Sequence, residues 1–342
     1  MFSARLGFFT QPTSAATASY VVVAHFTTPF VTAYPWSSGF GTKYANPATL
    51  PASTGVSAAF TSDASALGIT HSVSPYVTAY PWSSSGFGTK YANPATLPAG
   101  TQGTGVAFNN TNSVIAVSST GSPYIQAYPW SSGFGTKYAN PATLPAGQGN
   151  EVAWSANGTV IAVAHNTTPY ISAYSWSSGF GTKYANPATL PPIATTGVSF
   201  NGNSDIAVAS GSSPWILAYP WSSGFGTKYA NPATLPGTGG SGNDSVKFSP
   251  AGTTVAINSD ITPFIYAYPW SSGFGTKYAD PATLPTNASL GSIAFNSSSD
   301  TLAIGTSDTP FVYAYPWSSG FGTKYANPAT LPTGGARGLA FI

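Results

Sequence analysis

Residues 33–51 read AYPWSSGFGTKYANPATLP, and this stretch occurs seven times along the chain with few changes. Its central part, GFGTKYA, is unaltered in all seven copies. Each copy is marked by a tryptophan followed by two serines, and these tryptophans are spaced 45–49 residues apart: Trp36, Trp82, Trp130, Trp176, Trp221, Trp270 and Trp317. No stretch between them has the 3.6-residue periodicity of a helix, so each unit is expected to be a group of short strands.

The third unit shows how such a group is divided. Strand-forming residues occupy positions 105–108, 114–118 and 124–130, and polar turns separate these runs. A fourth strand is expected around residues 136–140, where Pro141 and Pro145 end the pairing, as suits the outer edge of a sheet. Seven such units predict an all-β fold, a seven-bladed β-propeller with four-stranded antiparallel blades.

The chain holds one more candidate for the first strand of a blade than seven blades need. The eight candidates are residues 6–9, 58–60, 105–108, 151–154, 197–200, 245–248, 292–295 and 338–341. The link from Phe9 to the next strand is longer than in the other units, and Phe341 is followed by one residue. We therefore expect residues 338–342 to complete the first blade and close the ring. Residues 1–19 then form an N-terminal arm, and residues 20–342 form the propeller.

Charge is scarce, since charged residues make up 5% of the chain and aromatic residues 14%. Seven of the ten basic residues are one lysine per repeat, which spreads them around the ring, whereas nucleic-acid binding needs clustered cations. The chain has no cysteine, and no apolar run approaches the roughly 20 residues of a membrane span. We expect no nucleic-acid partner, no cofactor and no membrane insertion. The apolar run at residues 6–9 is too short for a recognisable signal peptide.

Two segments resemble known propeller repeats. The stretch VKFSPAG at residues 246–252 resembles the opening of a WD40 or similar repeat, although the units lack the Trp-Asp and Gly-His pairs of that family. The repeated block quoted above resembles repeats of propeller proteins predicted from tailed-phage and marine viral genomes, and this resemblance covers nearly the whole chain after residue 19. It implies a virion component, located in a virion or an extracellular assembly.

The units do not vary evenly along their length. They are nearly identical from the tryptophan to Leu-Pro, whereas the loops between the second and third strands, and between blades, differ. Duplication with gene conversion accounts for this without any function. The functional interpretation is that the uniform rim binds a repeated partner or further copies of the chain. The candidate rim residues are Phe40, Lys43, Phe87, Lys90, Phe134, Lys137, Phe180, Lys183, Phe225, Lys228, Phe274, Lys277, Phe321 and Lys324.

The sequence shows no arrangement typical of a catalytic site. His25, His71 and His165 share one position before the loop proline, where a hydrogen bond would close the loop, and they belong to different blades. They are a poor basis for a metal site, which needs convergent ligands. Asp260 and Asp308 lie in neighbouring loops, where a shared calcium ion is an alternative to simple turn capping. No close acid pair and no nucleophile–base set is visible, so we expect no catalytic residue and no bound metal.

These observations predict a non-enzymatic structural or binding propeller. The expected role is that of a virion or surface-assembly component that binds a protein partner, copies of itself or a host. A glycan-binding propeller, in which exposed aromatic rings stack on sugars, is the alternative. A propeller hydrolase is the more distant alternative.

Overall fold

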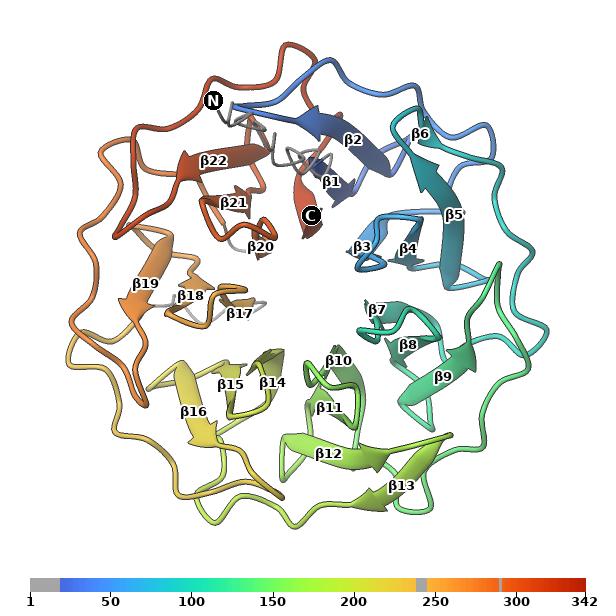
Figure 1. Cartoon of the computed structure of the whole chain (residues 1–342), viewed down its shortest axis with the longest axis vertical. Helices are drawn as coiled ribbons and strands as arrows, with labels where there is room; N and C mark the ends of the chain where they lie inside the picture. Colours follow the sequence, from blue (N-terminus) through green and yellow to red (C-terminus); the bar gives the residue numbers. More distant parts are fainter. Residues whose placement is uncertain (1–18, 238–244, 289–290) are drawn as a thin grey trace, which may run out of the picture.

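The computed structural model describes residues 19–237, 245–288 and 291–342, and every regular element in these ranges is a β-strand. The strands form seven antiparallel sheets. The sheets are arranged around a common axis, with one end strand of each sheet innermost (Figure 1). The all-β prediction is thus confirmed. The candidate strand at residues 6–9 lies outside the described residues.

From the inner strand outward, the first sheet contains β23 (Ala336–Phe341), β1 (Ser19–His25) and β2 (Val31–Trp36), and the second contains β3 (Gly55–Phe60), β4 (Ala66–His71), β5 (Val77–Ser83) and β6 (Gly86–Phe87). The third contains β7 (Gly103–Phe108), β8 (Val114–Ser119) and β9 (Ile125–Pro129), and the fourth contains β10 (Gly149–Trp154), β11 (Val160–His165), β12 (Ile171–Trp176) and β13 (Phe180–Lys183). The fifth contains β14 (Thr195–Asn201), β15 (Asp205–Ser210) and β16 (Ile216–Pro220). The sixth contains β17 (Val246–Phe248), β18 (Thr254–Asn258) and β19 (Ile265–Pro269), and the seventh contains β20 (Ile293–Phe295), β21 (Thr301–Gly305) and β22 (Val312–Pro316).

The core lies between neighbouring sheets. The second strand of each sheet is rich in β-branched residues, and in β8 all six residues are buried. On the third strand a small side chain alternates with a large one, as with Ala127 and Tyr128, which are both fully buried. Each small side chain leaves room for a large one from the adjacent sheet, so Ala162 of one sheet packs in one cluster with Val208 of the next.

The last strand pairs with the first. In the β1–β23 ladder Val21 lies opposite Phe341, and Val23 lies opposite Leu339. The amide of Tyr20 also donates to the carbonyl of Ile342 at 3.1 Å. The segment expected to pair with the first blade therefore does so, and its strand begins two residues earlier, at Ala336.

The prediction of four strands per sheet is wrong for five of the seven sheets, which have three. Around residues 136–140 there is no strand. In these five units the fourth strand is reduced to a single bridge between the tryptophan and the next phenylalanine, such as Trp130 with Phe134.

A proline on the third strand explains this shortening. In the third sheet the amide of Trp130 points inward to the carbonyl of Ser113, so the nitrogen of the preceding residue, Pro129, points outward, where its carbonyl accepts from Gly135. A proline nitrogen has no hydrogen to donate to an outer strand. The one unit with serine at this position, Ser175, has the four-residue strand β13.

We expect Ser175→Pro to remove most of β13. The change deletes an outward amide hydrogen, and one backbone hydrogen bond contributes about 1 kcal/mol, which corresponds to about a fivefold loss of exchange protection. Hydrogen exchange of the amides at residues 181–183 measures it. Ser175→Ala keeps the amide and serves as the control, since it removes only the hydroxyl. Unchanged protection in Ser175→Pro would contradict the explanation.

The segment after each tryptophan runs around the outside of the molecule as an outer belt, formed by residues 41–51 and their equivalents (Figure 1). The ring of Tyr44 packs edge-on against Trp82 of the next sheet, with centroids 5.4 Å apart. The hydroxyl of Tyr80 in that sheet donates to the belt carbonyl of Thr49 at 2.7 Å. The same tyrosine–tryptophan contact recurs between all neighbouring sheets. Identical contacts require identical residues, which is a structural reason for the uniformity of the belt.

Candidate functional site

The inner strands surround a channel that is lined mainly by small side chains. One position, three residues before the aromatic residue at the end of each inner strand, carries Gly338, Ser57, Gly105, Glu151, Gly197, Ser245 and Ser292. A Cβ added at Gly338 would lie 2.6 Å from the Cα of Ser57, so glycine is required for these backbones to approach so closely. Glu151 is the single large side chain at this position, and it extends into the channel.

Two cavities occupy this channel. The first, of about 220 Å³, is lined by Ser57, Gln102, Thr104, Gln148, Asn150, Glu151, Ser292, Arg337 and a few neighbours, and ten of its thirteen lining residues have polar side chains. We call it the polar cavity. The second, of about 290 Å³, is lined by eleven apolar side chains among sixteen residues, including Ala107, Phe108, Trp154 and Phe200. We call it the aromatic cavity. Both cavities are lined by Glu151.

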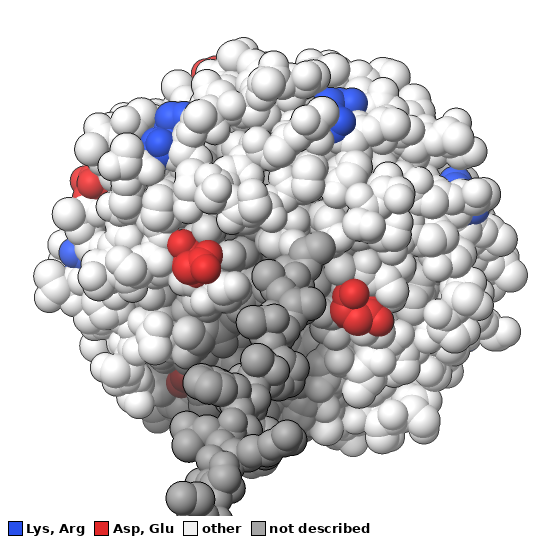
Figure 2. Space-filling view, turned by 45° about the horizontal axis from the view of Figure 1, so that its top comes forward, with Lys and Arg blue, Asp and Glu red and all other residues white. Residues whose placement is uncertain are grey.

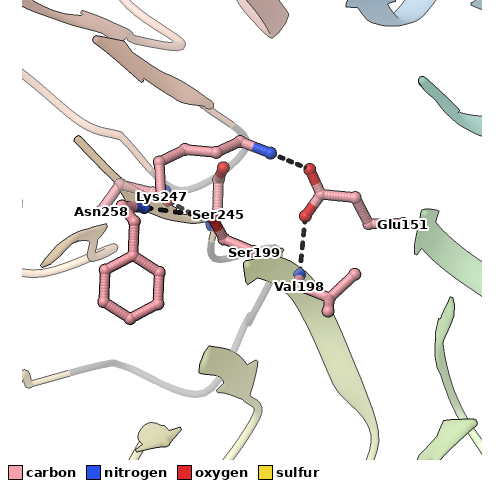
Figure 3. Close-up of polar contacts among 7 residues, drawn as sticks. Glu151, Val198, Ser199, Ser245, Lys247 and Asn258 are labelled. Atoms are coloured by element: carbon pink, nitrogen blue, oxygen red, sulfur yellow. Dashed lines mark hydrogen bonds and ion pairs between the residues drawn. The ribbon is translucent and has the colours of Figure 1, made fainter. Parts of the chain in front are cut away.

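The carboxylate of Glu151 is held by two different strands. One oxygen, Oε1, forms an ion pair with Nζ of Lys247 on β17, and the other, Oε2, accepts the amide of Val198 on β14 at 2.9 Å (Figure 3). The strand that carries Lys247 is positioned in turn by the amide of Phe248, which donates to Oγ of Ser199 at 3.1 Å. A carboxylate has about four lone-pair positions, so two acceptor positions remain for water or a ligand.

The ion pair is only partly buried, with side-chain exposures of 29% for Lys247 and 18% for Glu151. Pairs exposed to this extent contribute roughly 0–1 kcal/mol to stability. A gain in stability therefore does not explain why Glu151 and Lys247 lie in the channel, although charged residues make up only 5% of the chain.

Arg337 of β23 lines the polar cavity. Its guanidinium lies over the ring of Phe26, at 5.2 Å from the centroid, and burial lowers the pKa of the guanidinium. Among the described residues no carboxylate is paired with it. The polar cavity thus contains a cation whose counter-charge a bound ligand can supply.

Sequence reasoning missed this site, although the sequence carries a signal for it. Glu151 is the only glutamate in the chain. Apart from the seven repeat lysines and Arg5, the only basic residues are Lys247 and Arg337. These three charged residues have no counterpart in the other repeats, and all three line the channel on inner strands. Their positions could have indicated the site. The face of the molecule seen in Figure 2 in contrast carries isolated charges on a mostly uncharged surface.

The predicted rim residues lie around the outside of the molecule and are engaged within their own units. The phenylalanines pack edge-on against the tryptophans, as Phe40 does against Trp36 at 5.0 Å between centroids. The lysines donate to the side chain three residues later, as Lys43 does to Asn46 at 2.6 Å. The structure does not bring the fourteen residues together. Their role in binding an assembly partner stays a prediction, as does an extracellular location.

The three histidines lie in three different sheets and are fully buried. Nε2 of His25 is 3.0 Å from Oγ1 of Thr32, and His71 and His165 make the equivalent bonds to Thr78 and Ser172. Burial lowers the pKa of each histidine to about 4. Within the described ranges no group of three or more metal-ligating side chains occurs. The same residues include no helix long and apolar enough to cross a membrane.

Comparison with known proteins yields structural neighbours only, since no family model and no curated protein matches the chain. A protein described as a candidate 6-phosphogluconolactonase from Bacteroides fragilis superposes with a TM-score of 0.70 at 12% identity, covering 97% of this chain and all of the other. The periplasmic gluconolactonase of Pseudomonas aeruginosa gives 0.67 at 12% identity, covering 95% and 99%. A protein of unknown function from Desulfotomaculum acetoxidans gives 0.65 at 15% identity, covering 94% and 98%. The fold is of the β-propeller type. At these identities the likeness shows the fold alone.

The comparison corrects the functional expectation. Two of the propellers of matching architecture described above are named as lactonases, and neither is named as a WD40 or a viral protein. The assignment to non-enzymatic virion components was therefore wrong. It rested on the uniform outer repeat, which identical contacts between sheets account for, and it passed over the charged residues of the channel.

Proposed function

We propose that the protein is a hydrolase that opens lactones in the central channel, with Glu151 as the general base. The observation that carries the proposal is the position of the Glu151 carboxylate, which lines both cavities and is oriented by Lys247 and the Val198 amide. The lactonase names of the propeller neighbours support the same reaction class.

Lactone opening needs a base, a water molecule and a positive environment. The Glu151 carboxylate takes a proton from water as the water oxygen bonds to the lactone carbonyl carbon. The ring C–O bond then breaks, and the same proton passes to the departing ring oxygen, which gives a hydroxy acid. Lys247 orients the carboxylate through the ion pair and lies where it can stabilise the oxyanion.

Arg337 supplies a second positive charge in the polar cavity. A guanidinium binds a carboxylate or an oxyanion through two parallel hydrogen bonds, and partial burial strengthens this attraction. Amide and hydroxyl groups of Gln102, Asn150 and Ser57 line the same cavity and suit the hydroxyl groups of a sugar-derived lactone.

Replacing Glu151 by glutamine tests the proposal. Glu151→Gln keeps the size of the side chain and removes the base, so kcat/KM for D-glucono-1,5-lactone should fall about 10²- to 10⁴-fold. Proton release followed with a pH indicator measures the reaction. Asp280→Asn is the matched control, because it makes the same chemical change in the outer belt, where six units already have asparagine. Equal activity of Glu151→Gln and the parent, or a parent no faster than spontaneous opening, would refute the role.

We further propose that the seven sheets are the blades of one ring that closes through β23. The support is the five-pair ladder between β23 and β1, together with the burial of Ala336, Leu339 and Ala340. On this proposal the propeller begins at Ser19, the first residue of β1 and one residue before the predicted boundary, and the remainder of the predicted N-terminal arm lies outside the described residues.

A further inference from the structure

The two cavities of the channel differ in chemical character and lie at opposite ends of the inner strands. The polar cavity is lined by residues at the beginnings of these strands, such as Thr104 and Asn150. The aromatic cavity is lined by residues at their ends, such as Phe108 and Trp154. Ser57, Glu151 and Ser292 line both, so the proposed base lies where the two meet.

The aromatic cavity has the size and lining of a site for an apolar group. A cavity of about 150 Å³ with an aliphatic lining is enough to hold benzene, and this one is of about 290 Å³. Its walls are the methyl groups of Ala59, Ala107 and Ala153, with the half-buried rings of Trp154 and Phe200. At the equivalent position of the sixth sheet the alanine is replaced by Lys247, the partner of Glu151. The apolar walls of the aromatic cavity therefore end at the Glu151–Lys247 pair. Such a cavity suits an apolar substituent of a substrate whose reacting bond lies beside this pair.

We propose that the substrate is an amphiphilic lactone, with its hydroxylated ring in the polar cavity and an aryl-sized apolar substituent in the aromatic cavity. This inference rests on the proposed lactone hydrolysis. A simple polar lactone fills only one of the two cavities. The apolar substituent adds binding that is independent of the base, and it determines which lactones are preferred.

The test compares D-glucono-1,5-lactone with its 6-O-benzyl derivative. The benzyl lactone should have a kcat/KM about 10- to 100-fold higher, mainly through a lower KM, because the phenyl group leaves water. Ala107→Leu places a larger side chain in the aromatic cavity and should lower the kcat/KM of the benzyl lactone to that of glucono-1,5-lactone. Ala107→Ser keeps the volume, matches Ser199 at the equivalent position of β14, and should retain the preference. Ala45→Leu adds a leucine to the exposed outer belt and serves as a second control.

Failure of this inference can be told apart from failure of the proposed function. Turnover of both lactones at equal kcat/KM would overturn the amphiphilic substrate and leave the hydrolase standing. Binding of the ring-opened acid, 6-O-benzyl-D-gluconate, is measured separately by calorimetry in the parent and in Ala107→Leu. Binding that Ala107→Leu abolishes, without turnover of either lactone, would support the amphiphilic ligand class and refute the hydrolase. Absence of both binding and turnover would overturn both.

Discussion

Deletion of residues 336–342 is expected to abolish cooperative folding. The deletion removes β23, which supplies the inner partner of β1 and contributes Leu339 and Ala336 to the core between the first and last sheets. It also removes the ring of Phe341, which packs against Trp36 with centroids 5.0 Å apart. Burial of one large apolar side chain contributes about 1.5–3 kcal/mol, and the β1 edge would be left unpaired. Such losses approach the total stability of about 5–15 kcal/mol of a typical domain.

Circular dichroism and urea denaturation measure this loss. Removal of residues 1–10, which precede β1, is the control and should leave the midpoint nearly unchanged. Gly338→Val tests the same contact in the full-length chain, because its Cβ would lie 2.6 Å from the Cα of Ser57 and so force the two inner strands apart. A cooperative transition of normal midpoint after deletion of residues 336–342 would overturn closure through β23.

The second large effect is a loss of stability in mild acid. The pKa of His25, His71 and His165 is lowered by burial to about 4 in the folded state, against an ordinary value of 6.5. The unfolded chain therefore binds more protons than the folded chain between about pH 4 and 6.5. The free energy of unfolding should be constant above pH 6.5 and should fall as the pH falls through this window. Each histidine contributes on the order of 3 kcal/mol to the fall over the whole window, and the contributions of the three histidines add.

Equivalent positions in the other sheets supply the matched variants. In the first sheet the large His25 is hydrogen-bonded to the small Thr32, seven residues later. At the equivalent positions of the third sheet the small Ser119 is hydrogen-bonded to the larger Gln126. The double change His25→Ser and Thr32→Gln reproduces the pair of the third sheet and keeps the volume. The difference in unfolding free energy between pH 7.5 and pH 5 should then fall by about one third, because one of the three histidines no longer contributes to it. Urea denaturation at both pH values measures this difference. The same pH dependence with the histidines replaced in all three sheets would exclude them as its cause.

Much of this architecture is encoded locally, because each strand has its own pattern of residues. The repeat predicts seven units of short strands, and the first three strands of the third unit appear within one or two residues of their predicted positions. The segment at residues 338–342 could be assigned to the first sheet because it has the same pattern as the other inner strands. The missing fourth strand of five sheets was also predictable in principle, since Pro129 and its equivalents in those sheets lack the outward amide hydrogen and Ser175 has it.

Tertiary structure alone decided the rest. Glu151 and Lys247 are 96 residues apart, and no local pattern relates them. They meet because inner strands of different sheets converge on one axis, where glycine and serine leave room for their side chains. The outer belt is the most strongly repeated part of the sequence, and its residues contact the next sheet, as Tyr44 contacts Trp82 and Thr49 accepts from Tyr80. Residues that repeat in every unit make the same contacts in every sheet. A site in the channel instead needs residues that differ from sheet to sheet, such as Glu151 and Lys247.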